Sequence, residues 1–286
     1  MAKEVSDRNE KEIRILDLNQ LNEMLLEQKS LLFSQGFFYT NIEKNGEGFL
    51  LERVAPLIDI FFDCGCNKGY VSNYIYQHNK NIEFHLFDIV DKDFIEFNAP
   101  AMQYNQTVLS DQIGTEFVYS VSPKNNWNSS EVSSLYLPDN VNCKTSDFIR
   151  SEFPSTTLDS YSENLGNRGI IFLKLDIEGS EIKCLRGATN FLDNFNVAGY
   201  LEYNPRVWEK GGYSYKQLYR FMLDLDFLLF RITPLGLKKI PYYSELNENN
   251  FCYYFFCRPK FLENLDLEKA EIERKLGINK SEILLF

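Results

Sequence analysis

Two carboxylates, Asp176 and Glu178, stand directly between an apolar segment and a helical pattern. Residues 170–175 predict a buried strand, and residues 180–186 predict the helix that follows it. Ligands of open α/β sheets bind where the strands end, so this spacing brings both acids to the lip of a sheet. Carboxylates there can accept a proton from a bound substrate.

The two histidines of the chain offer no better base. His78 falls on the apolar face of a helical pattern and His85 in the middle of a predicted strand, so both are interpreted as packing or capping residues. A tyrosine such as Tyr203 and a metal-bound oxygen remain alternatives. A purely structural role is also open, in which Asp176 caps the helix and Glu178 compensates its dipole.

A second strand-to-helix turn lies upstream, where Asp63, Gly65, Asn67 and Gly69 alternate with other residues. The glycines would let the backbone approach a ligand, and Asp63 is predicted to face the crevice. The spacing is not that of a dinucleotide-binding turn, and an acid before the turn suits a ligand with an ammonium group, such as S-adenosylmethionine.

Three further polar residues complete a candidate adenosine site. Asp88 ends a predicted strand at the position where an acid accepts hydrogen bonds from ribose hydroxyls, in NAD and S-adenosylmethionine alike. Ser110 and Asp111 follow another strand and could contact an adenine edge. A turn held by these two side chains is an equal alternative.

Strand and helix patterns alternate along the chain, which predicts an α/β fold with a largely parallel sheet and helices on both faces. The predicted strands are 57–62, 82–87, 102–109, 115–120, 170–175, 197–203, 227–233 and 250–258, and the clearest helices are 70–77, 180–186 and 215–225. No helical pattern separates the last two strands, so the last is expected to be antiparallel. This ending favours a Rossmann-like sheet of the methyltransferase type.

We expect one main domain at residues 51–260. Apolar residues at helical spacing predict an N-terminal helical extension over 1–50, and an acidic amphipathic pattern predicts a C-terminal helical tail over 261–286. The tail would brace the domain or form a homodimer contact. A Ser- and Asn-rich segment, 120–142, contains Trp127 and is a candidate substrate loop.

The composition limits the partners. Lys and Arg number 30 against 41 Asp and Glu, a net charge of -11 that would repel nucleic acid. No signal segment and no membrane-spanning run is evident, so we expect a soluble, cytoplasmic protein. Six cysteines show no disulfide or zinc spacing and are expected to be reduced.

Three segments together resemble the FkbM-type family of S-adenosylmethionine-dependent methyltransferases. They are the glycine turn 61–69, the Thr-Leu-Asp element 157–159, and the segment 174–187, which is similar to K-I-D-V-E-G-x-E-x-x-x-L-x-G. The resemblance covers about residues 55 to 258 and implies a class I methyltransferase fold. One departure is Asp88, which stands where the family commonly has Phe-Glu-Pro.

The resemblance implies O-methylation of a hydroxyl on a sugar, glycan or secondary metabolite, with S-adenosylmethionine as cofactor. Asp176 would accept the proton, and Glu178 with Glu202 would orient the acceptor. Lys174 is expected to pair with a neighbouring acid. Ser134 belongs to a Ser-Ser-Leu element like that of the family, and it joins Trp127 as a substrate-binding candidate.

Several alternatives stay open at this point. The three acids could hold a magnesium or calcium ion, although metal-free catalysis is favoured. The chain could be an inactive cofactor-binding module or could act on another acceptor class. Methylation of a nucleobase amine is disfavoured, because Asp-Ile-Glu-Gly follows the strand where such enzymes carry Asn/Asp-Pro-Pro-Tyr/Phe.

Overall fold

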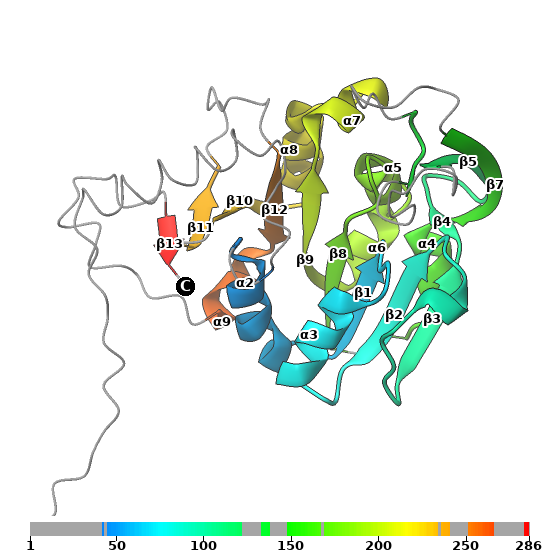
Figure 1. The fold of residues 1–286 in the computed structure, drawn as a ribbon. Coiled ribbons are helices and arrows are strands. Elements are labelled where there is room, and N and C mark those ends of the chain that lie inside the picture. Colours follow the sequence, from blue (N-terminus) through cyan, green and yellow to red (C-terminus); the bar gives the residue numbers. More distant parts are fainter. Residues whose placement is uncertain are drawn as a thin grey trace, which may run out of the picture.

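A nine-stranded sheet runs through the centre of the protein in the computed structural model (Figure 1). The structure describes residues 42, 45–121, 133–137, 148–166, 169–233, 236–240, 251–265 and 283–285. The strands, in order across the sheet, are β13 (Ile283–Leu285), β11 (Gly236–Lys239), β10 (Leu228–Thr233), β12 (Cys252–Cys257), β9 (Asn196–Tyr203), β8 (Ile170–Leu175), β1 (Ile60–Cys64), β2 (Glu83–Asp88) and β3 (Met102–Gln106).

Five neighbouring strands, β3, β2, β1, β8 and β9, are parallel, and β12 is antiparallel to both of its neighbours, β9 and β10. The expected antiparallel return of the last predicted strand is therefore confirmed. The fold is an α/β fold with a mostly parallel, mixed sheet of the Rossmann-like class I methyltransferase type. Two further strands, β11 and β13, extend the sheet beyond β10 and were not predicted.

Helices cover both faces of the sheet because the central strands are apolar on both sides. In β1, Phe61 enters one core cluster while Ile60 and Phe62 enter the other, as the alternation of a strand requires. The first cluster includes residues of α2 (Glu47–Val54), the 3-10 turn η1 (Ala55–Leu57), α3 (Tyr70–His78) and α9 (Pro259–Asn264). The second includes residues of α4 (Leu158–Ser162), α5 (Glu181–Arg186), α6 (Thr189–Asn194), α7 (Pro205–Lys210) and α8 (Tyr215–Asp224).

A small second sheet stands beside the carboxyl end of the main one (Figure 1). Its strands are β4 (Val108–Leu109), β7 (Phe148–Thr156), β5 (Gly114–Val121) and β6 (Ser133–Ser134), in that order. The predicted strand 102–109 was wrong in one respect: Thr107 divides it, so β3 stays in the main sheet and β4 joins the second. Strand β7 was missed, because its side chains alternate without a clean apolar face.

Two helices run across the predicted domain limits. Helix α2 runs across residue 50 and packs into the core, and α9 runs across residue 260. Strand β13 occupies residues 283–285, within the predicted helical tail. The predicted helical stretch 9–35, Trp127 and most of the tail lie outside the described residues. In the part that is described, no helix has the length and apolarity to cross a membrane.

Glycine at position 199 is required by the packing of β9 between β8 and β12. A Cβ atom there would lie 2.2 Å from the carbonyl oxygen of Leu173 and 2.7 Å from the ring of Phe256. We predict that Gly199→Ala lowers the free energy of unfolding by about 1–3 kcal/mol, measured by urea denaturation. Gln103→Ala, at an exposed position of β3, is the control and should stay within about 0.5 kcal/mol of the parent. Equal losses in both variants would contradict this reading.

Candidate functional site

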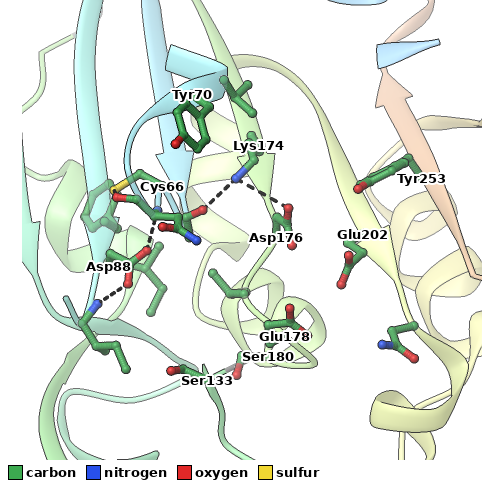
Figure 2. Close-up of a pocket in the computed structure, with 18 of the residues that line it drawn as sticks. Cys66, Tyr70, Asp88, Ser133, Lys174, Asp176, Glu178, Ser180, Glu202 and Tyr253 are labelled. Atoms are coloured by element: carbon green, nitrogen blue, oxygen red, sulfur yellow. Dashed lines mark hydrogen bonds and ion pairs between the residues drawn. The ribbon is translucent and has the colours of Figure 1, made fainter. Parts of the chain in front are cut away.

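Four of the predicted acids gather around a cavity of about 860 Å³ at the carboxyl ends of β1, β2, β8 and β9. Six of the candidate residues line it: Gly65, Asn67, Asp88, Asp176, Glu178 and Glu202. Figure 2 shows Asp88 at one end of this pocket and Glu202 at the other. The site predicted from two separate strand-to-helix turns is thus one continuous space.

A buried ion pair lies at the floor of the cavity, which Lys174 lines. The Nζ atom of Lys174 in β8 lies 3.0 Å from Oδ1 of Asp63 in β1, and it donates a hydrogen bond of 2.8 Å to the carbonyl oxygen of Gly65. The same ammonium lies 3.8 Å from Oδ2 of Asp176. The expectation that Lys174 pairs with a neighbouring acid is confirmed.

Asp63 does not face the crevice, which corrects the prediction made from its place before the turn. Its side chain has no exposed surface, and its other oxygen accepts a 2.6 Å hydrogen bond from the Ser72 hydroxyl of α3. A carboxylate at that depth is stabilised by the ammonium of Lys174 rather than by a ligand. Asp63 thus acts on the site through Lys174.

The glycine turn after β1 has three residues in the left-handed region, where Gly65, Asn67 and Gly69 have φ values of 79°, 48° and 84°. Asparagine tolerates this conformation better than most side chains, which explains its presence between two glycines. A Cβ atom on Gly65 would lie 1.7 Å from the carbonyl oxygen of Asp176. The glycine therefore lets the two turns of the site pack together at the edge of the cavity that Gly65 lines.

The carboxylate of Asp88 organises the neighbouring turn. Its Oδ2 accepts a 2.7 Å hydrogen bond from the backbone N–H of Asn67, and its Oδ1 accepts bonds from Ile89 and Val90. Burial raises the pKa of this carboxyl, and the three backbone donors oppose that shift. Each carboxylate oxygen accepts about two hydrogen bonds, so Oδ2 retains capacity for one more donor from the cavity.

Residues 176–180 form a loop whose shape is fixed by its neighbours. Glu178 is left-handed, with φ at 51°, a strained conformation for a residue with a side chain. Its carbonyl accepts a 2.6 Å hydrogen bond from the hydroxyl of Ser134. Ser134 thus supports the loop from β6 and does not line the cavity.

Glu181 is a positioning residue that the sequence analysis missed. One of its oxygens accepts the N–H groups of Ile177 and Gly179, and the other accepts the indole N–H of Trp208 at 2.8 Å. The side chain has no exposed surface, which raises the pKa of this carboxyl to about 7. An acid three residues after Glu178 could have been recognised as a cap of the loop.

Asp176, Glu178 and Glu202 place one oxygen each within 4.8 Å of the others. Figure 2 shows their carboxylates around the same end of the pocket. Burial raises the pKa of all three groups, and that of Glu178 reaches about 8. Repulsion by Asp176 adds to the shifts of Glu178 and Glu202, whereas Asp63 and Asp88 add to the shift of Asp176 and Lys174 opposes it. Oε2 of Glu202 is buried and has no hydrogen-bond partner. This end of the cavity attracts protons or cations.

Other candidate residues lie away from the cavity. Ser110 is buried and donates a 2.6 Å hydrogen bond to Glu116, and Asp111 lies 3.8 Å from Lys183. These contacts fit the alternative role of holding a turn. Tyr203 is buried in an aromatic cluster, whereas Tyr253, which was not predicted, lines the cavity. Gly69 does not line it either.

His85 and the described cysteines behave as packing residues, whereas His78, expected on an apolar helix face, is exposed. His85 is buried, with Nδ1 2.7 Å from the hydroxyl of Tyr161, and His78 is exposed at the end of α3. Among the described residues, Cys64, Cys66, Cys184, Cys252 and Cys257 are all free and buried. Burial raises the pKa of the Cys64 and Cys66 thiols, which favours their neutral form.

The sheet and its cavity define a class I methyltransferase-like protein, and a family model makes this assignment specific. A model of the methyltransferase FkbM domain matches residues 63–229, more than half of the 286-residue chain. The chain therefore belongs to the FkbM methyltransferase family. The match includes both turns of the site, from Asp63 through Glu202.

Two solved structures illustrate the range of similar folds. Methyltransferase FkbM from Methylobacillus flagellatus KT is 14% identical, with a TM-score of 0.40 over 69% of this chain and 43% of that chain. The chain thus spans less than half the length of that protein. The plantazolicin methyltransferase BpumL, in complex with SAH, is 9% identical, with a TM-score of 0.39 over 84% of this chain and 98% of that chain. None of the curated proteins compared with the chain matches it.

We predict strong coupling between Lys174 and Asp63. Lys174→Met should lower the free energy of unfolding by about 3–5 kcal/mol, because it leaves a buried carboxylate without its cation. The double variant Lys174→Met/Asp63→Asn should recover part of this loss. Urea denaturation of both single variants and the double variant measures the coupling. Lys68→Met, which removes an exposed partner of Glu96, is the control and should change stability little. Additive losses would argue against the pair.

We also predict a pH dependence from Glu47, a buried cavity residue at the start of α2. Burial raises the pKa of this carboxyl from 4.5 to about 7. The native state then holds a proton that the unfolded state releases, so the contribution to stability is full below pH 4.5 and is lost as the pH rises to about 7. The unfolding free energy of the parent minus that of Glu47→Gln should fall across this window, as measured by urea denaturation. Parallel pH profiles would contradict the prediction.

Proposed function

We propose that the protein transfers a methyl group from S-adenosylmethionine to a hydroxyl oxygen of a sugar, glycan or secondary metabolite. The observation that carries this proposal is the arrangement of the cavity, in which the Asp88 turn lies at one end and three carboxylates converge at the other. A volume of about 860 Å³ is within the usual range for a small-molecule site and leaves room for a cofactor and an acceptor together.

The residues of the first end fit an adenosine group. Asp88 lines the cavity and retains hydrogen-bonding capacity on Oδ2, as a partner of ribose hydroxyls must. Apolar side chains stand next to it for contact with a purine ring: Phe87, Ile89, Val108 and Leu109. Ser110 and Asp111 do not line the cavity, so we propose that they affect adenosine binding only by holding the backbone turn after β4.

The carboxylates of the second end fit the acceptor. When bound, S-adenosylmethionine supplies an electrophilic methyl group on a sulfonium centre. Asp176 accepts the proton that the acceptor hydroxyl releases as its oxygen bonds to the methyl carbon and the carbon–sulfur bond breaks. Glu178 and Glu202 orient the acceptor through its other hydroxyls. Holding the hydroxyl in line contributes up to roughly 7–11 kcal/mol to catalysis.

The experiment that tests the proposal separates binding from turnover. Calorimetric titration of the protein with S-adenosylhomocysteine should show binding, and titration with NADH should show none. Asp88→Asn should weaken the first by about tenfold or more, because it removes a charged acceptor. Asp91→Asn, an exposed neighbour outside the cavity, is the matched control.

Asp176→Asn should keep S-adenosylhomocysteine affinity within a few-fold and lower methyl transfer at least about a hundredfold. Methyl transfer is measured from labelled S-adenosylmethionine to a panel of sugars, glycans and other hydroxyl compounds. Undiminished transfer in Asp176→Asn would remove this residue from the proton-accepting role. Cofactor binding without transfer to any acceptor would favour an inactive binding module.

A further inference from the structure

We propose that Asp176, Glu178 and Glu202 together hold one divalent cation with a preference for oxygen ligands, such as Mg²⁺, Mn²⁺ or Ca²⁺. The inference deepens the proposed function, on which its catalytic meaning rests, but the cation site itself stands on the geometry of these three side chains. They come from two adjacent parallel strands, because Asp176 and Glu178 follow β8 and Glu202 lies in β9.

The spacing of the oxygens fits a single ion. Two ligands of one Ca²⁺ at about 2.3–2.6 Å each lie at most about 4.6–5.2 Å apart, and two ligands of Mg²⁺ lie at most about 4.2 Å apart. One oxygen from each carboxylate lies within 4.8 Å of the others. Calcium fits this spacing directly, and magnesium or manganese fits after small side-chain rotations. The cluster contains no imidazole or thiolate, which disfavours zinc.

Glu202 provides an observation that is independent of this spacing. The residue is 7% exposed, and its Oε2 is buried without a hydrogen-bond partner. A buried carboxylate oxygen without a donor is costly, so native proteins supply a partner, and an ion is one such partner. Figure 2 shows Glu202 on the wall that faces Asp176 and Glu178. The proposed ion, in the space that the three acids share, would supply a partner for the Glu202 carboxylate.

The neighbouring positive charge is too small to neutralise the three carboxylates. Among the ion pairs of the described residues, only Lys174 reaches it, at 3.8 Å from Asp176, and that ammonium is closer to Asp63. Three carboxylates against one shared ammonium retain an excess of negative charge that a divalent cation would neutralise. The strained backbone of Glu178 is held in place by Ser134 and so keeps its side chain at this position.

A cation in this position would also contact the acceptor. Three carboxylate ligands leave about half of a six-coordinate shell open for water and for oxygens of the substrate. A hydroxyl bound to the ion loses its proton more readily, and the second oxygen of Asp176 stays available to accept that proton. An acceptor that offers two neighbouring oxygens would bind best, because it can occupy two open positions.

Calorimetric titration of the full chain with MgCl₂, MnCl₂ and CaCl₂ tests the site without any methyl acceptor. We expect one saturable site per chain for at least one of these ions, below about 1 mM. Glu202→Gln and Glu178→Gln should each weaken it at least about tenfold, as loss of a ligand requires. Glu209→Gln, an exposed acid on the adjacent helix α7, should bind like the parent.

Two outcomes would overturn the inference: no saturable site up to about 10 mM of any of the three salts, or equal binding in the parent and Glu202→Gln. Melting curves of each variant with and without CaCl₂ verify that the altered proteins are folded. Titration with S-adenosylhomocysteine distinguishes this failure from that of the proposed function. In either case, cofactor binding together with methyl transfer in the presence of a chelator would leave the proposed function standing.

Discussion

The ion pair between Lys174 and Asp63 lies in the middle of the sheet, where two central parallel strands meet. Both side chains are almost completely buried, so each charge depends on the other for stabilisation. Two hydrogen bonds connect the pair to its surroundings: Lys174 donates to the carbonyl of Gly65, and the Ser72 hydroxyl donates to Asp63. These contacts hold the glycine turn and the start of α3 in place, and Lys174 also lies 3.8 Å from Asp176 at the end of β8. The floor of the cavity depends on this contact.

A second constraint acts on the loop after β8. Glu178 is held in a left-handed conformation that costs about 1–3 kcal/mol, and the loop keeps it because Glu181 and Ser134 bind its backbone. Glu181 is in turn fixed by the indole of Trp208. These contacts hold like-charged groups near one another against their repulsion. Strain and repulsion concentrated at one end of a cavity are typical of a site that binds a ligand or catalyses a reaction.

Much of the fold was accessible to sequence patterns. Apolar runs and helical periodicity predicted where the central strands and helices begin and end, to within a few residues. The absence of a helical pattern before β12 predicted its antiparallel direction. The second sheet was not accessible, because β7 has a mixed pattern and β6 contains two residues only. Those strands are defined by pairing with distant segments, and a local pattern carries no information on such partners.

The sequence by itself determined the family and the acids that end the strands, since these depend on residue types at short, fixed spacings. It also indicated that Lys174 needs an acidic partner, because a lone charge inside a strand is costly. Only the tertiary structure decided which acid that is, and so removed Asp63 from the cavity wall. The expected proximity of Asp176, Glu178 and Glu202 arises in the structure because β8 and β9 are neighbours and their carboxyl ends share one edge of the sheet. Depth of burial and proximity across strands arise from packing, which no short segment contains.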